Sequence, residues 1–266
     1  WLRSIQRDDG CLFKEGETHG IGYHHGIAGL ALIEAAATGR VKETVAAAQK
    51  ALDYSVNIHR NKETGGWRYS ANSTTSDLVV SSWYIQQLKV AKISVFKVPA
   101  ESMEGAIRFL DFVEEKANPH HYGYTDNTSV GYRRSIMGCC SRYFLGSKKD
   151  GLEAGLAWAI AQGGLPTWGA YGGSVDLYYW YYGSLAAFQQ GGEAWKKWNE
   201  ALVQTLTENQ RKGGDENGSF DPVGAYAEYL GRAGQTALAA LCLEVYYRYP
   251  RFDRGDEPKA GEAMNP

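Results

Sequence analysis

The chain has 266 residues, 44% of them hydrophobic, which is enough to bury a large core in one domain or in two small ones. The formal net charge of −2 and the scattered charges argue against nucleic acid or an acidic membrane surface as a partner. No stretch approaches the roughly 20 unbroken apolar residues of a membrane span, so we expect no transmembrane segment. The chain starts at Trp1 in what reads as the middle of a helix, and we expect it to be part of a longer polypeptide.

Gly-containing loops with an aromatic residue recur along the chain at intervals of roughly 50 residues, a period that suits a helical hairpin and its loops. They lie at 9–13, 65–69, 122–124, 163–168 and 218–221. A helical pattern precedes each loop and another follows it. The sequence therefore predicts about five hairpins in one repeat domain, residues 1–250, followed by a polar tail, residues 251–266.

Two kinds of helix alternate in the predicted hairpins. In chain order the helices are expected at 1–6, 23–37, 41–58, 77–91, 100–113, 129–145, 152–162, 175–190, 193–210 and 234–247. The helix before each loop is amphipathic, whereas the helix after it is apolar on nearly every side, as buried helices are. The pattern predicts an inner apolar layer shielded by an outer one, with Ser76 or Asp77 capping the second inner helix and Ser174 the fourth.

The four cysteines, Cys11, Cys139, Cys140 and Cys242, form no CxxC motif and no disulfide framework. We expect them to be small buried hydrophobic residues. The sequence also has no Gly-rich phosphate loop with a lysine and no G-x-S-x-G motif. It therefore predicts no cofactor and no metal site.

The loop at 6–13, Gln-Arg-Asp-Asp-Gly-Cys-Leu-Phe, resembles the Q-x-x-D-G-x-W signature of squalene and oxidosqualene cyclases. Gln210 with Gly218-Ser219-Phe220 is a looser copy, and 65–69 followed by 75–77 is another. These copies resemble the prenyltransferase and squalene oxidase repeat over most of the chain. The resemblance implies an all-α fold, an α/α toroid like that of terpenoid cyclases and protein prenyltransferases. It also implies an inner-helix cavity that ligands enter where the inner helices begin.

The catalytic motifs of those families are missing from this chain. Squalene–hopene-type cyclases protonate an alkene with a D-x-D-D motif, which does not occur here. Protein prenyltransferases bind zinc through an Asp-x-Cys pair and a later His. Asp176 matches the Asp, but Tyr178 stands in place of the Cys and Gln235 in place of the His. The resemblance therefore implies a fold, while the reaction stays unassigned.

Candidate site residues follow from the inner-helix starts, which would converge on one mouth of the ring. Asp176, His24 and His25 are the candidates for acid–base work, with His19 in the loop before the histidine pair. A structural role at the junction between loop and helix is the alternative for the histidines. Asp176 alternatively pairs with an arginine.

The candidates for ligand binding come from the second to the fifth inner helix. They are Asp77, Trp83, Asp126, Arg133, Arg134, Tyr178, Tyr179, Tyr182 and Gln235. Asp77 could serve as a helix cap instead, and Trp83 as core. One arginine could bind an anionic group or pair with Asp126 or Asp176. Clustered tyrosines suit a polar-tipped cavity wall, because each buried hydroxyl needs a partner.

Three functions are compatible with these residues. The first is a pocket for an apolar or amphipathic, isoprenoid-like ligand, with catalysis left open. The second is a toroid that processes polysaccharide, for which Asp77, Asp126 and Asp176 are the candidate carboxylates. The third is a non-catalytic interaction scaffold whose loops bind a partner protein.

Overall fold

The computed structural model describes residues 1–13, 20–39, 41–94, 96–146 and 151–252. Within these residues the protein is helical, and the one extended pairing is an isolated bridge between Glu114 and Tyr122. The all-α prediction is confirmed. No helix in the described ranges combines the length and the apolar character that crossing a bilayer requires.

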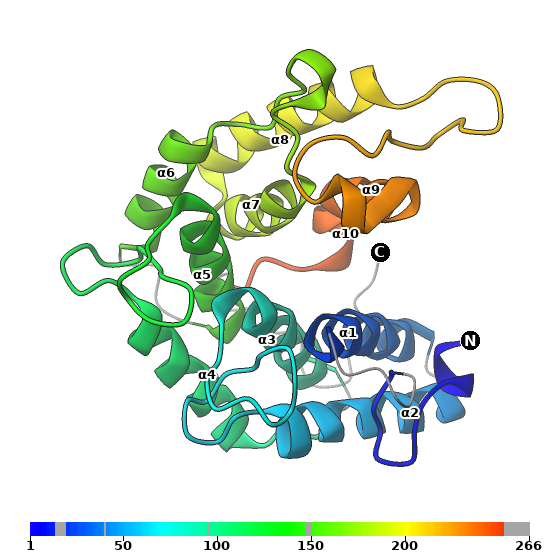
Figure 1. The fold of residues 1–266 in the computed structure, drawn as a ribbon, viewed down its shortest axis with the longest axis vertical. Coiled ribbons are helices and arrows are strands. Elements are labelled where there is room, and N and C mark those ends of the chain that lie inside the picture. Colours follow the sequence, from blue (N-terminus) through cyan, green and yellow to red (C-terminus); the bar gives the residue numbers. More distant parts are fainter. Residues whose placement is uncertain (14–19, 40, 95, 147–150, 253–266) are drawn as a thin grey trace.

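The helices form two layers, as Figure 1 shows. The inner row consists of α1 (Ile21–Gly39), α3 (Leu78–Lys92), α5 (Tyr132–Leu145), α7 (Leu177–Gln190) and α9 (Ala227–Leu243). Each inner helix packs against the next one along the row. The outer helices are α2 (Lys42–Asp53), α4 (Ala100–Val113), α6 (Leu152–Gly163) and α8 (Gly192–Asn209). Three short elements complete the fold: 3-10 turns at Leu2–Ser4 and Ala170–Gly172, and α10 (Val245–Arg248).

Burial follows the predicted alternation of helix types. In α3 nearly every residue from Leu78 to Ala91 is buried, whereas α2 buries only Ala48, Ala51 and Leu52. An inner helix is covered by its two neighbours in the row and by the outer helices, whereas an outer helix packs on the core with one face only. All four cysteines are buried and free, as expected.

The repeat is visible in the loops between outer and inner helices. In three loops the backbone N–H of Arg7, Asn61 or Arg211 donates to the carbonyl of the residue that follows a loop glycine. The N–H of that glycine donates in return to the carbonyl of the same Arg or Asn. The glycines are Gly10, Gly65 and Gly218, with φ of 95°, 85° and 83°. His120 takes the same place in the third hairpin with φ 65°, and the N–H of Glu115 donates to the carbonyl of His121. Three of the five loops therefore share both backbone bonds, and the third loop shares the first of them, while the N–H of His120 donates to the Glu114 side chain.

Each of these loops is fastened to its inner helix in the same way. The N–H of the buried apolar residue that follows donates to a side chain on the inner helix. The four pairs are Leu12 to His25, Trp67 to Ser81, Tyr122 to Ser135 and Phe220 to Thr236, at 2.9–3.1 Å. A buried N–H without an acceptor costs about 1–3 kcal/mol, so these four side chains hold the hairpins together.

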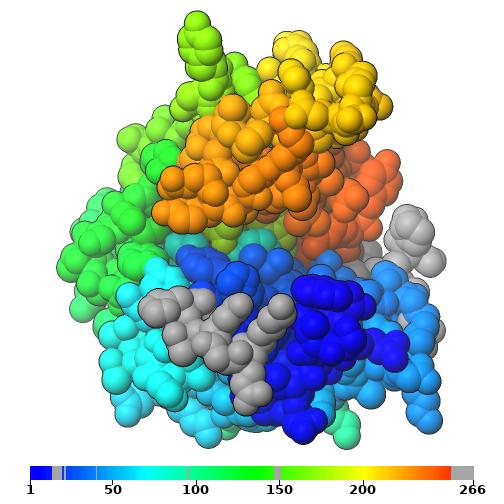
Figure 2. All heavy atoms as spheres, turned by 45° about the vertical axis from the view of Figure 1, so that its right-hand side comes forward, coloured from blue at the N-terminus to red at the C-terminus, as the bar shows by residue number. Residues whose placement is uncertain are grey.

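The C-terminal segment reaches back to α1. Arg248 pairs with Glu34 of α1 at 2.8 Å, and the hydroxyl of Tyr249 donates to Glu34 at 2.5 Å. Phe252 packs on Phe144 of α5. Figure 2 shows the region of α9, in orange, directly above the N-terminal residues, in blue. Arg251 and Phe252 of the predicted tail belong to this packed segment, and residues 253–266 lie outside the described ranges.

Two predicted boundaries were wrong. Ser174 does not cap α7, because its hydroxyl bonds within the loop, to Gly169 and Thr167, and the side chain of Asp176 accepts from the N–H of Tyr179 instead. The fifth inner helix begins at Ala227 rather than Gly234, with a break at Gly231. The helix predicted at 41–58 is found as α2 followed by a π-helical turn, Tyr54–His59, and side-chain periodicity does not reveal this change of helix type.

Candidate functional site

Six tyrosines gather at the starts of the inner helices and in the loops that lead to them. We call this group the tyrosine collar: Tyr23, Tyr69, Tyr124, Tyr132, Tyr178 and Tyr226. Ring contacts join Tyr23 to Tyr69 at 5.8 Å and Tyr178 to Tyr226 at 5.9 Å, and the hydroxyls of Tyr69 and Tyr124 are hydrogen-bonded. Each of the five hairpins contributes at least one tyrosine to the collar.

Backbone hydrogen bonds between successive hairpins place two of these tyrosines. The N–H of Gly22, at the start of α1, donates to the carbonyl of Tyr69, and the N–H of Leu78 donates to the carbonyl of Tyr124. Gly22 is required at this point, because a Cβ there would come within 2.3 Å of the Arg68 carbonyl oxygen. These two bonds hold the second loop against the start of α1 and the third loop against the start of α3.

Asp77 lies fully buried beneath the collar at the N-cap of α3. Its Oδ1 accepts from the N–H of Val80 at 2.8 Å, but no donor among the described residues reaches Oδ2. Burial raises the pKa of Asp77 to about 6, against the opposing effects of the Val80 N–H, the Arg68 guanidinium and, more weakly, the Val79 N–H. The carboxyl lies close to the collar. Burial is the main cause of the raised pKa values of Tyr23, Tyr124 and Tyr178, and the charge of Asp77 makes a smaller contribution to each.

Aromatic side chains of α3 and α7 pack against one another below Tyr178. The indole N–H of Trp83 donates to the Tyr178 hydroxyl, and the Trp83 ring stacks on Tyr181 at 5.2 Å. Tyr182 lies 5.7 Å from both Trp83 and Tyr178, and its buried hydroxyl bonds to nothing within the described part of the chain. The interior thus carries a second buried polar group whose hydrogen bonding is incomplete.

The Asp176 carboxylate faces the collar from the N-cap of α7. Its Oδ2 accepts from Nε of Arg133 at 2.5 Å, and the Arg133 guanidinium also lies over the ring of Tyr132 at 5.1 Å. The pairing of an arginine with Asp176 was one of the two alternatives predicted for the arginines. Arg134 is half-buried, and its Nε has no acceptor among the described residues.

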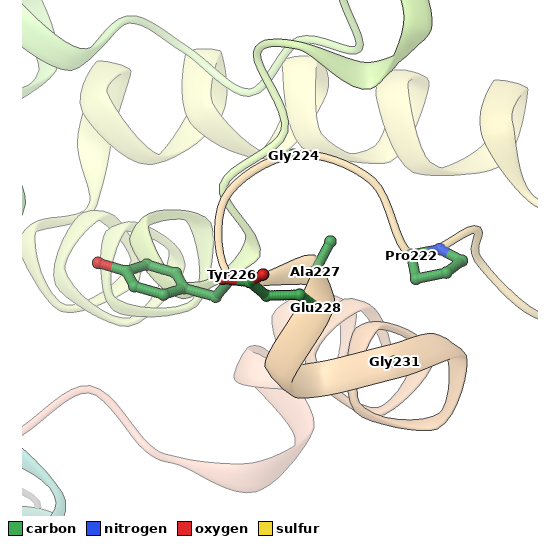
Figure 3. A pocket seen from close by; sticks show the side chains of 6 residues that line it. All are labelled: Pro222, Gly224, Tyr226, Ala227, Glu228 and Gly231. Carbon is green, nitrogen blue, oxygen red and sulfur yellow. The ribbon is translucent and has the colours of Figure 1, made fainter.

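An open hollow adjoins the collar at the start of α9, as Figure 3 shows. It has a volume of about 510 Å³ and lies between the loop at Pro222–Gly224 and the first turn of the helix. Tyr226 lines the hollow, and its ring points away from the other lining side chains in Figure 3 and contacts the ring of Tyr178. Gln235 holds the loop through a 2.8 Å bond from Nε2 to the Val223 carbonyl, and its Oε1 is buried without a donor in the described ranges.

The two histidine candidates lie away from Asp77 and Asp176. His25 is in the core, where Nδ1 accepts from Leu12 and Nε2 faces Ala51 and Ser55, and burial lowers its pKa to about 3. His24 is exposed and stacks on Phe13 at 5.0 Å. His19 lies outside the described residues.

Two further candidates make local contacts. Asp126 accepts from the N–H and the hydroxyl of Thr128 within its own turn, and these bonds lower its pKa. The Tyr179 hydroxyl donates to the carbonyl of Gly164 at 3.0 Å, which ties α7 to the loop after α6. The structure therefore brings Asp77, Trp83, Tyr178 and Tyr182 together beside the Asp176–Arg133 pair, and places Asp126 and Tyr179 in structural contacts.

Sequence reasoning missed four residues of the site: Arg68, Tyr69, Tyr124 and Tyr226. The guanidinium of Arg68 lies over the rings of Tyr69 and Tyr124, at 5.2 and 5.8 Å. A signal was present, because Tyr69 and Tyr124 both stand two residues after the buried aromatic residue of their loop. Aligning the repeat copies by their glycines, with His120 in register, would have shown it.

The described residues bring no three His, Cys, Asp or Glu side chains together as a ligand set for a metal ion. The arrangement can stack a ligand on aromatic rings, accept hydrogen bonds through two carboxyl groups and offer positive charge through two arginines. Neither the models of known protein families nor the curated proteins include a match to this sequence.

Proposed function

We propose that the chain is an α/α toroid domain of the squalene cyclase and prenyltransferase type, and that its tyrosine collar binds an apolar or amphipathic, isoprenoid-like ligand. The observation that carries the proposal is the position of Asp77 beneath the collar, fully buried and with one oxygen that no described donor reaches. A buried carboxyl left half-bonded costs stability, and a ligand that completes its hydrogen bonds recovers part of that cost.

The collar suits a molecule with one apolar and one polar part. Tyr69 and Tyr226 expose 37% and 49% of their surface, so ring faces are available to an apolar chain. Rings of this kind gain area burial and, in pairs, a further stacking contribution. In this proposal the hollow next to Tyr226 takes the apolar part, and the carboxyl groups of Asp77 and Asp176 are the partners of the polar part.

A second candidate is the binding of a polysaccharide. Asp77 and Asp176 are carboxyl groups in contrasting environments at one rim, the first buried without a cationic partner in contact and the second bonded to Arg133. Pairs of carboxyls in contrasting environments serve as acid and base or nucleophile in glycan cleavage. Sugar rings also stack on exposed tyrosines.

Fluorescence titration of the full chain with farnesol and with cellohexaose separates the two candidates. We expect farnesol to bind, and Tyr178→Ala combined with Tyr226→Ala to weaken that binding about tenfold, because two stacking surfaces are lost. Tyr247→Ala is the matched control, since Tyr247 is 61% exposed on α10, outside the collar. Binding of cellohexaose alone would favour the polysaccharide candidate, and binding of neither would favour a scaffold that recognises a protein.

A further inference from the structure

The unpaired group beneath the collar is an acceptor of hydrogen bonds. Asp77 is 0% exposed, and its Oδ2 receives no hydrogen bond from the described residues. The positive groups nearby are already engaged: Arg133 bonds to Asp176 and stacks on Tyr132, and Arg68 stacks on Tyr69 and Tyr124. A ligand therefore gains most by bringing a donor to Asp77, and less by bringing an anion to the arginines.

The hydroxyls around Asp77 are directed elsewhere. Tyr69 and Tyr124 bond to each other, and the Tyr178 hydroxyl accepts from Trp83. The hydroxyls of Tyr124 and Tyr178 therefore lie near the Asp77 carboxyl, yet their hydrogen bonds in the described residues are made to Tyr69 and Trp83. The buried hydroxyl of Tyr182, below Tyr178, is another group without a hydrogen-bond partner in the described ranges, and it could pair with the same ligand group.

We propose that the ligand of the collar carries an uncharged hydroxyl group, and that this hydroxyl donates a hydrogen bond to Oδ2 of Asp77. The inference rests on the proposed function and specifies its ligand class, an alcohol rather than a hydrocarbon, an ether or an acid. Asp77 is a binding residue here, and no bond of the ligand is made or broken.

A hydrocarbon can fill the apolar part of the site but leaves Oδ2 as it is. An ether brings an oxygen without a proton, which places two acceptors against each other and is disfavoured when the carboxyl is ionised. A carboxylic acid is ionised at neutral pH and repels the Asp77 carboxylate. Of these four ligand classes, only the alcohol supplies the missing hydrogen-bond donor without bringing a second negative charge next to Asp77.

The test compares farnesol with its methyl ether, which share the same apolar chain and differ in one proton donor. Dissociation constants are measured at pH 7.5 by fluorescence titration of the full chain. We expect farnesol to bind about tenfold or more tightly than the ether, as a hydrogen bond to a charged acceptor provides. In Asp77→Asn the preference should disappear, because the amide N–H donates equally well to either ligand oxygen. Asp126→Asn, an exposed carboxylate in its own turn, is the matched control and should keep the preference.

Acidification gives a second readout on the same pair of ligands. The groups that face Asp77 are the guanidinium of Arg68 and the hydroxyls of Tyr23, Tyr124 and Tyr178, and burial raises the pKa values of the three hydroxyls. Below about pH 6 the carboxyl of Asp77 is protonated and can donate to the ether oxygen. The preference for farnesol should therefore shrink between pH 7.5 and pH 5.

The outcomes separate the inference from the function on which it rests. Equal binding of farnesol and its ether to the unmodified chain would overturn the inference and leave the proposed function standing. Tighter binding of farnesoic acid than of farnesol would assign the polar anchor to Arg68 or Arg133 and would also overturn the inference. Failure of every isoprenoid to bind would remove both. The comparison of ligands needs no variant, so it remains decisive if Asp77→Asn does not fold.

Discussion

Replacement of Asp77 by Asn should stabilise the protein at neutral pH, although Asp77 caps α3. Burial raises the pKa of this carboxyl from 3.8 to about 6, so the folded protein holds its proton more tightly than the unfolded chain does. At one pKa unit per 1.36 kcal/mol, ionised Asp77 lowers the free energy of unfolding by about 3 kcal/mol above pH 6. Stability from this group is present below pH 3.8 and is lost as the pH rises through 6.

Asparagine keeps the cap and removes the charge. Its Oδ1 can accept from the N–H of Val80 as Asp77 does, and Asn ranks with Asp as an N-cap residue. We therefore expect Asp77→Asn to raise the free energy of unfolding by about 1–3 kcal/mol at pH 7.5. For a domain of this size the melting temperature should rise by several degrees. At pH 4 the difference from the unmodified chain should nearly vanish, since Asp77 is then protonated in the folded state.

Urea unfolding followed by circular dichroism at pH 4, 5, 6 and 7.5 measures this difference. Asp176→Asn is the matched control, because Asp176 caps α7 with the same geometry but bonds to Arg133, so its loss should destabilise the chain by about 1 kcal/mol or more. A variant at Asp77 that is less stable than the parent at every pH would show that the carboxylate is compensated, and the reasoning would be refuted.

Two further predictions concern the core. Burial lowers the pKa of His25 to about 3 and of His59 to about 4, so the unfolded chain binds more protons below pH 6.5 and stability is lost as the pH falls from 6.5 toward 4. Each histidine should cost about 2–3 kcal/mol at pH 4.5, measured by urea unfolding, and an unchanged midpoint would contradict it. Ser135→Ala removes the acceptor of the Tyr122 N–H and should cost about 1–3 kcal/mol by thermal unfolding, whereas Ser102→Ala, whose buried hydroxyl meets no partner in the described residues, should cost close to nothing.

Periodicity was sufficient to predict the helices, because burial on one or on all sides leaves a regular trace in the sequence. The predicted 100–113 is the observed α4, and the predicted 175–190 differs from α7 by two residues. Helix ends depend on single side chains in particular loops, which periodicity does not encode. Ser174 and Asp176 both suit a cap, and the choice falls on Asp176 because the hydroxyl of Ser174 is used within its own loop.

The site was predicted in part for a related reason. Once the inner helices were predicted, residues on them such as Trp83 and Tyr178 could be assigned to the expected ligand site. Arg68 and Tyr69 lie on a loop, and their position depends on the hydrogen bond from Gly22 that draws the loop across α1. That contact joins residues of two different hairpins, and no pattern within one hairpin reveals it.

The repeat separates structural positions from functional candidates. His25 looked like an acid–base residue in the sequence, yet Ser81, Ser135 and Thr236 make the same bond to the loop in other hairpins. Three different side chains can therefore perform that task, and none needs to titrate. The helix starts differ from one hairpin to the next.

Asp77 stands out at the helix starts because the fold does not require its charge. The N-cap residues of α5 and α9 are Gly131 and Tyr226, and neither makes a side-chain capping bond, so a capping carboxylate is dispensable in this architecture. Asn would supply the same cap at Asp77 without burying a charge. A residue that caps no better than Asn and lowers stability at neutral pH is explained more readily by a ligand than by folding. Asp77→Asn should therefore both stabilise the protein and abolish its preference for an alcohol. If stability rose and the preference stayed, Asp77 would be a helix cap that lowers stability and has no role in binding.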